Sequence, residues 1–197
     1  MEQRVQSLNK WLLLFWAAIV GVTFYSSTKP KTIADTWVAT TDPNLVYMNG
    51  FLYYNKKAYT GWLFENYDNG NRAKEIPYYE GKIEGTMKTW YDNKKPEQVR
   101  TYVLGEKQGV HRGWWPTGSP KFEYNFVDDE HEGLAKEWFS NGKLYRAFHY
   151  KQGHENGQQQ MWWEDGTIRA NYVIKDNRQY GLIGRKLCKN VYKNEER

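Results

Sequence analysis

The sequence predicts an all-β fold: an elongated single-layer antiparallel β-meander of about six 24-residue hairpin repeats, preceded by one N-terminal hydrophobic helix. Glycines recur every 24 residues, aromatic pairs and turn dipeptides follow the same period, and an apolar run lies near the N-terminus. A period of roughly 20 to 50 residues is typical of arrays whose units are stabilised by their neighbours. The repeat glycines are Gly61, Gly85, Gly109, Gly133, Gly157 and Gly181.

The N-terminal element is predicted over residues 1–28. Residues 11–25 form a largely apolar run that follows Arg4 and Lys10, a pattern typical of a signal peptide or a short membrane anchor. A cleaved signal needs small residues before the cut, whereas Phe24 and the residue after it are bulky. We therefore expect an uncleaved signal-anchor or transmembrane segment, with secretion after cleavage as the alternative.

The location of the repeats is predicted from the same segment. Basic residues flank the apolar run on both sides, so the positive-inside rule gives almost no preference for either orientation. An apolar N-terminal run with basic residues ahead of it is nevertheless the usual export signal. We expect attachment to the cytoplasmic membrane, with the repeats on the extracytoplasmic, periplasmic side.

Three segments follow the anchor. Residues 29–45 contain prolines and threonines without a strong period and are predicted to form a tether. The repeat array is predicted over 46–187, beginning with an irregular hairpin whose turn signals are Asn49-Gly50 and Asn55-Lys56. Residues 188–197 form a basic tail.

Each repeat is predicted to form a β-hairpin. An Asn-Gly or Asp-Gly type turn follows the aromatic pair, and such turns are the strongest short hairpin signal because both residues tolerate positive φ. Apolar residues two apart come next, as in Phe122, Tyr124 and Phe126, which is strand spacing. A second turn returns the chain to the next glycine.

Aromatic residues five and six positions after the glycine are the candidate partner-binding residues. Neighbours in a strand point to opposite faces, so at least one series is expected to be partly exposed, and a one-residue register change would exchange the faces. The simpler interpretation is that both series pack the sheet, whereas exposed contiguous aromatics mark partner sites. The candidates are Trp90, Tyr91, Trp114, Trp115, Trp138, Phe139, Trp162 and Trp163.

The charge of +5 lies mainly beyond residue 175, so the repeats are close to neutral and a nucleic-acid groove along them is not expected. The basic residues Arg185, Lys186, Lys189 and Lys193 are candidates for contact with anionic lipid or an acidic partner. A solvated segment that protects the last sheet edge is the alternative. Cys188 is the only cysteine, which excludes an intramolecular disulfide framework.

No catalytic constellation is present, so we expect no enzyme, no cofactor and no small-molecule substrate. Acidic residues and His131 cluster in the turn at 128–132, but the equivalent turn of the next repeat lies about 10 Å away, too far for shared zinc ligation. No glycine-rich phosphate loop opens a helix. A flat sheet also supplies few concave sites for acid–base chemistry.

The glycine, the aromatic pair, the Asn-Gly turn and the Tyr/Phe-x-x-Gly pattern over residues 46–187 resemble the bacterial MORN-repeat variant family. The pattern departs from the family at Asn66 and Lys94, and the last repeat carries Lys186 and Leu187 at its aromatic positions. Many bacterial members are regarded as antitoxins of toxin–antitoxin systems, and the wider MORN class is associated with scaffolding and membrane attachment. The resemblance implies these roles.

Repeat, tether and anchor together predict a non-enzymatic, membrane-tethered scaffold that presents a β-sheet surface to an unidentified protein partner. An antitoxin-like neutraliser of a cognate toxin is the first alternative and would place the repeats in the cytoplasm. An assembly or maturation factor for an envelope enzyme is the second.

Overall fold

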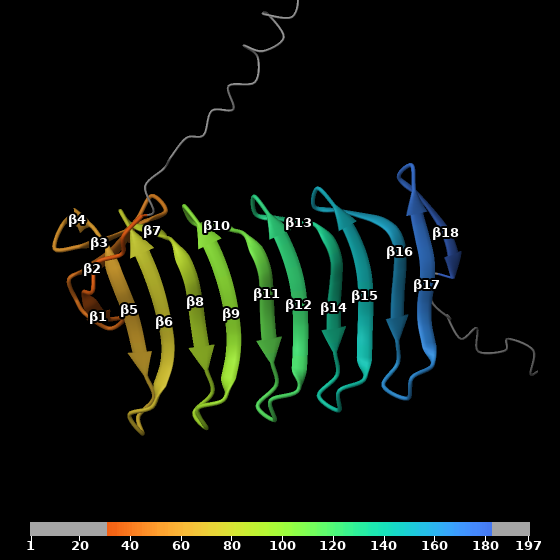
Figure 1. Ribbon diagram of the computed structural model, residues 1–197, viewed down its shortest axis with the longest axis horizontal. Helices are drawn as coiled ribbons and strands as arrows, with labels where there is room; N and C mark the ends of the chain where they lie inside the picture. The colour runs from red at the N-terminus through yellow and green to blue at the C-terminus, as the bar shows by residue number, and fades with distance from the viewer. Residues whose placement is uncertain (1–30, 183–197) are drawn as a thin grey trace, which may run out of the picture. The chain divides into compact units, whose positions relative to one another are not determined.

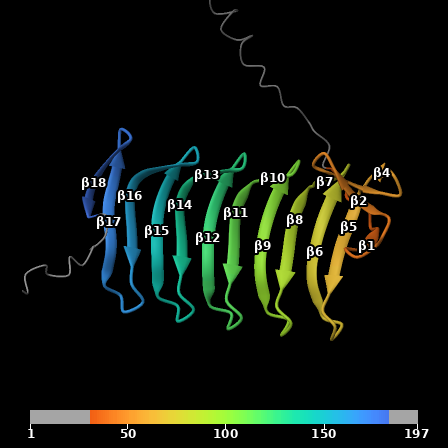
Figure 2. The same cartoon turned by 180° about the vertical axis from the view of Figure 1, so that it is seen from behind.

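The computed structural model describes residues 31–182, and this part of the chain is all-β without any helix (Figure 1). A long sheet and a small three-stranded sheet make up the fold, which Figure 2 shows from behind. The predicted N-terminal hydrophobic helix lies outside the described residues. Within residues 31–182, no helix is long and apolar enough to cross a membrane.

The long sheet is the predicted meander, because each repeat adds one hairpin beside the last and neighbouring hairpins pair antiparallel. Along its main path the strands are β1 (Trp37–Ala39), β5 (Gly61–Asn66), β6 (Arg72–Tyr79), β8 (Gly85–Trp90), β9 (Pro96–Val103), β11 (Gly109–Trp114), β12 (Pro120–Val127), β14 (Gly133–Trp138), β15 (Leu144–Lys151), β16 (His154–Trp162), β17 (Ile168–Lys175) and β18 (Arg178–Leu182). Three two-residue strands extend the hairpins off this path, namely β7 (Lys82–Ile83), β10 (Glu106–Lys107) and β13 (Glu130–His131).

The N-terminal end of the long sheet carries an additional small core. Strands β2 (Leu45–Met48), β3 (Phe51–Tyr54) and β4 (Lys57–Ala58) form the second sheet through the two turns predicted from Asn49-Gly50 and Asn55-Lys56. Its Leu52 joins a buried cluster with side chains from β1, β5 and β6, which closes the first repeat. The cluster consists of Val38, Leu52, Tyr59, Leu63 and Tyr78.

Part of the segment predicted as a tether is structured. Residues 37–39 form β1, which pairs parallel to β5. Two contacts explain this pairing: Val38 is buried in the small core, and the Trp37 ring stacks on Trp62 at a centroid distance of 5.2 Å. The Trp62 ring belongs to the first repeat and the small core adjoins it, so the edge of the array orders this stretch of chain.

The two kinds of turn differ in backbone conformation. At the turn of Asn69 and Gly70, only the glycine has positive φ, at 81°, whereas positive φ was predicted for both residues. The Asn69 side chain instead accepts a hydrogen bond from the backbone N–H of Asn71, at 2.9 Å, which stabilises the turn locally. The second turn has positive φ at both central residues, 49° at Glu80 and 82° at Gly81, as in a type I′ hairpin.

The repeat glycines supply positive φ near the start of each repeat, and in the second repeat this position lies where the strand pairing shifts. Gly85 has a φ of 96°, in the left-handed region that favours glycine. Before it, β7 pairs with the end of β6, and after it, β8 pairs with the middle of β6 and with β9. All six repeat glycines have positive φ, so their 24-residue spacing marks a recurring bend in the chain.

Lys94 occupies the left-handed turn position that is glycine in the other repeats, with a φ of 65°. The Lys94→Gly substitution is expected to raise the free energy of unfolding by about 1 kcal/mol, because the left-handed conformation strains a residue with a Cβ. Urea denaturation followed by tryptophan fluorescence measures the change.

The reciprocal substitution is Gly142→Ala, at the same turn position two repeats later. No atom lies within 4 Å of a Cβ added there, and the φ is 83°, so the substitution tests backbone conformation alone. It is expected to lower the free energy of unfolding by about 1 kcal/mol. Equal stability of both variants and the parent would contradict this account of the turn.

Candidate protein-interaction surface

One face of the long sheet, here called the packed face, carries most of the buried side chains. Its rings lie under cationic side chains, which shield the rings from water without a second sheet. Arg100 lies 5.7 Å from the centroid of Phe122, and Arg146 lies 5.2 Å from that of Phe148. The buried side chains on this face are Leu63, Tyr78, Thr89, His111, Phe122, Phe126, Ala135, Phe148, Gln159 and Ala170.

Two histidines form part of the packed face at the middle of the array. The rings of His111 and His131 lie 4.7 Å and 4.3 Å from the ring of Phe126. His111 is 1% exposed and its Nε2 lies 2.8 Å from the carbonyl oxygen of Thr101, whereas Nδ1 of His131 is buried without a hydrogen-bond partner. Burial lowers the pKa of both imidazoles. Both rings therefore pack as neutral side chains near neutral pH.

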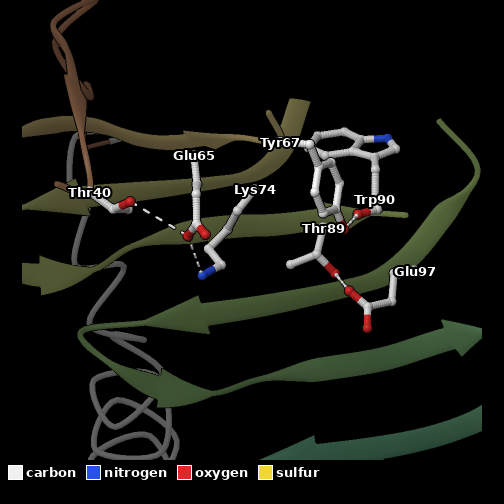
Figure 3. Close-up of polar contacts among 7 residues, drawn as sticks. All are labelled: Thr40, Glu65, Tyr67, Lys74, Thr89, Trp90 and Glu97. Carbon is white, nitrogen blue, oxygen red and sulfur yellow. Dashed lines mark hydrogen bonds and ion pairs between the residues drawn. The ribbon is translucent and has the colours of Figure 1, made fainter. Parts of the chain in front are cut away.

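The aromatic series six residues after the glycine ties successive repeats together. The Tyr67 hydroxyl donates a hydrogen bond to the Trp90 carbonyl at 2.8 Å, as Figure 3 shows. Tyr91 makes the same bond to Trp114 at 2.8 Å, and Nε1 of Trp115 donates to the Trp138 carbonyl at 3.1 Å. Tyr91 and Trp115, two of the predicted partner-binding residues, therefore have a structural role, as does the equivalent Tyr67.

The last two members of this series depart from that pattern. Phe139 has no polar group to donate and packs edge-on against Tyr145, at a centroid distance of 5.0 Å. Trp163 is 49% exposed and lies 4.5 Å below the guanidinium of Arg169. Each ring is thus contacted by the side chain six residues after it, and Phe139 cannot form the link to the next repeat that Tyr67 forms.

Polar side chains next to these rings satisfy one another across each hairpin. Lys74 and Glu65 form an ion pair at 2.8 Å, and the Thr89 hydroxyl donates to Glu97 at 2.9 Å (Figure 3). In the fourth repeat, Glu137 accepts hydrogen bonds from Tyr124 and Arg146 and lines a groove of about 480 Å³. Glu137 is therefore paired with Arg146 in this groove, while Lys121, which also lines it, lies over the Trp115 ring.

The opposite face, here called the open face, presents the aromatic series five residues after the glycine. Trp90, Trp114, Trp138 and Trp162 are all half-buried and lie opposite Pro96, Pro120, Leu144 and Ile168 across their hairpins. No hydrogen bond within residues 31–182 uses an indole N–H of these four tryptophans. Each indole is therefore anchored along one edge and retains an unused donor.

A column of cations runs beside these tryptophans on the open face. Lys88, Arg112 and Lys136 each lie two residues before a tryptophan and so project from the same face of the strand. Arg112 pairs with Glu123 at 2.8 Å, while Lys88 and Lys136 form no ion pair with any described residue. We call the six residues the tryptophan–cation stripe: Lys88, Trp90, Arg112, Trp114, Lys136 and Trp138.

The stripe is hollowed between its second and third repeats. A groove of about 290 Å³ lies there, lined by Arg112, Gly113, Trp114, Pro120, Phe122, Glu123, Lys136 and Trp138. The groove combines indole surface, unused N–H donors and an excess of positive charge. Such an arrangement suits recognition of a partner, because tryptophan and arginine dominate the binding energy of protein interfaces.

The sequence indicated the tryptophans of this surface and missed its cations. A lysine or arginine recurs at the third position after the glycine in three consecutive repeats, and this spacing was the available signal. The basic residues Arg185, Lys186, Lys189 and Lys193, with Cys188, lie outside the described residues. Within residues 31–182, no three His, Cys, Asp or Glu side chains form a group that could hold a metal ion.

A meander built from 24-residue hairpins that stack only on their neighbours is a repeat protein. The family described as MORN repeat variant matches two segments, residues 83–103 and 132–152, which begin just before Gly85 and Gly133. The resemblance predicted from the glycine and aromatic spacing is confirmed at these two places. No curated protein matches the sequence. MORN repeats in a β-meander indicate a protein that takes part in protein or membrane interactions.

Tyr91→Phe is expected to lower the free energy of unfolding by about 1 kcal/mol, because it removes the donor to the Trp114 carbonyl between two repeats. Tyr180→Phe is the matched control, since Tyr180 is 54% exposed and its hydroxyl has no hydrogen bond in the described residues. Urea denaturation of both variants measures the difference. A loss of the same size in Tyr180→Phe would contradict the proposed link.

Stability is expected to fall as the pH decreases below about 6.5, the ordinary pKa of histidine. Burial lowers the folded-state pKa of His111 and His131, so the unfolded chain binds protons first and gains stability relative to the folded chain. Above that pH both states are neutral at these residues and the contribution is fully present.

Thermal unfolding between pH 7.5 and pH 5 tests this dependence, at pH values above the carboxylate range. His131→Phe keeps a ring against Phe126 and Tyr150 and removes one titrating group. Its melting temperature is expected to fall less than that of the parent over the same pH range. An identical pH profile for both proteins would exclude His131 as a source of the effect.

Proposed function

We propose that the protein is a non-enzymatic, membrane-tethered scaffold that holds a protein partner on the open face of its repeat sheet. The tryptophan–cation stripe carries this proposal. Its indoles are only half-buried, their N–H groups are unused, and two of its three cations have no ion-pair partner among the described residues. These groups repeat in register across three hairpins, which suits a partner that contacts several repeats at once.

The packed face supports the proposal by contrast. There the rings lie under cations and the acidic groups are hydrogen-bonded to neighbours within the sheet. A partner on that face would have to displace internal contacts, which costs free energy that the open face does not require. The open face is therefore the better binding surface of the two.

The membrane part of the proposal rests on the apolar run at residues 11–25, and the extracytoplasmic location on the basic residues before it. A reporter enzyme that is active only outside the cytoplasm, fused after Arg197, tests the orientation. Activity of this reporter is the expected result. Activity of a cytoplasmic reporter at the same position would instead favour an antitoxin-like role against a cytosolic toxin.

Site-specific crosslinking in intact cells tests the scaffold itself. A photoreactive amino acid at Lys88 or Lys136 is expected to capture a protein partner, because both side chains belong to the stripe. The same amino acid at Lys121 serves as the control, since Lys121 lies over Trp115 at 4.7 Å on the other face. Capture at the control position with none at the stripe would overturn the choice of face.

A further inference from the structure

The spacing between equivalent residues of the tryptophan–cation stripe restricts the shape of a ligand that contacts several repeats. One repeat contributes two strands, and strands in a sheet lie about 4.8 Å apart, so equivalent stripe residues recur about every 9.6 Å. A segment that crosses the strands therefore meets the same indole and cation at that interval. Its own side chains must return to the same side at nearly the same distance to use each site.

Among regular backbones, polyproline II matches this interval. It advances 3.1 Å per residue with three residues per turn, so every third residue faces the same way after about 9.3 Å. A β-strand alternates its faces every 3.3 Å or so and would present opposite sides to successive repeats. An α-helix returns to the same face after two turns, about 10.8 Å, which matches one repeat less closely than the roughly 9.3 Å of polyproline II.

The chemistry of the stripe also suits this backbone. Polyproline II segments bind in aromatic-lined grooves, and their carbonyl groups are free because the backbone makes no internal hydrogen bonds. The groove of about 290 Å³ between Trp114 and Trp138 supplies two indole walls. Neither indole N–H is used within residues 31–182, in contrast to that of Trp115, which donates to a backbone carbonyl.

Charge identifies the third residue of each ligand turn. In these three repeats the stripe has three cations. Two carboxylates adjoin them and are already paired: Glu75, opposite Lys88, with Arg72, and Glu123, opposite Lys136, with Arg112. The excess is positive, so an acidic side chain in every turn of the ligand would lie near one cation. This pattern favours an acidic ligand over a basic one.

We infer that the stripe binds a proline-rich segment of the partner protein in the polyproline II conformation, with an acidic residue at every third position. The inference rests on the proposed scaffold function and names its ligand. The indoles receive the proline rings, the indole N–H groups donate to ligand carbonyls, and Lys88, Arg112 and Lys136 contact the acidic residues.

Fluorescence polarisation with the full-length protein in detergent tests the inference. The probe is a labelled (Pro-Pro-Glu)4 peptide, which is roughly 37 Å long as polyproline II and so spans the three repeats. It is expected to bind, whereas (Pro-Pro-Lys)4, (Gly-Gly-Glu)4 and a peptide of the same composition with irregular spacing are expected to bind at least about tenfold more weakly. Equal binding of the irregular or glycine peptide would overturn the inference.

Variants connect the binding to the stripe. The double variant Lys88→Glu, Lys136→Glu is expected to weaken (Pro-Pro-Glu)4 binding at least about tenfold. Lys151→Glu changes an exposed lysine outside the stripe and should leave binding unchanged. Trp114→Ala tests the indole wall, and circular dichroism shows whether its fold persists. Unchanged affinity in both the double variant and a folded Trp114→Ala would also overturn the inference.

Two further results separate this inference from the scaffold proposal. If crosslinks at Lys136 capture a protein whose crosslinked segment lacks proline and acidic residues, the scaffold stands and the polyproline ligand is wrong. If crosslinks form only to lipid, both are wrong. Sedimentation with vesicles of anionic phospholipid checks the second case, since loss of vesicle binding in the Lys88→Glu, Lys136→Glu variant would assign the stripe to the membrane.

Discussion

Each hairpin of this protein can bury its aromatic side chains only against the hairpins on either side of it. Over most of its length the sheet is a single layer, and the small sheet of β2–β4 joins its core only at the N-terminal end. Contacts between equivalent positions of successive repeats therefore provide most of the burial. This constraint explains why the rings, the tyrosine hydroxyls and the bend at the glycine all follow one period. A repeat of different length would move all of these groups away from their partners in the neighbouring repeat.

The hydrogen bonds between repeats enforce that period at both ends of the strands. At one end the Tyr67 hydroxyl reaches the Trp90 carbonyl of the next repeat. At the other end the side chain of Glu84 accepts a hydrogen bond from the backbone N–H of Leu104, in the next type I′ turn, at 2.7 Å. A ring or side chain of fixed length spans the gap only when neighbouring hairpins keep one separation, so these bonds also fix the spacing of the open-face residues.

Sequence reasoning predicted the features that repeat and missed those that occur once. The glycines, the aromatic pairs and the hairpin turns were evident because five or six copies of each support one another. Strand β1 was not predicted, since Val38 and Trp37 acquire their partners only after the first repeat has formed. The faces of the aromatic pairs could not be assigned either. They depend on a bulge at which the partner of Glu137 is Arg146 and that of Trp138 is Leu144, so Tyr145 is left over.

The cations of the stripe show a second limit of sequence reasoning. A lysine such as Lys88 or Lys136 is an ordinary residue for any solvated strand face, and its neighbours in the chain give it no particular role. Only strand pairing brings these residues into one column beside the tryptophans, about one repeat apart. The same pairing engages the aromatic series six residues after the glycine within the sheet and leaves the series five residues after it in partial contact with solvent. The 24-residue period that packs one face of the sheet also aligns equivalent residues on the open face. The tryptophan–cation stripe is therefore a consequence of that period.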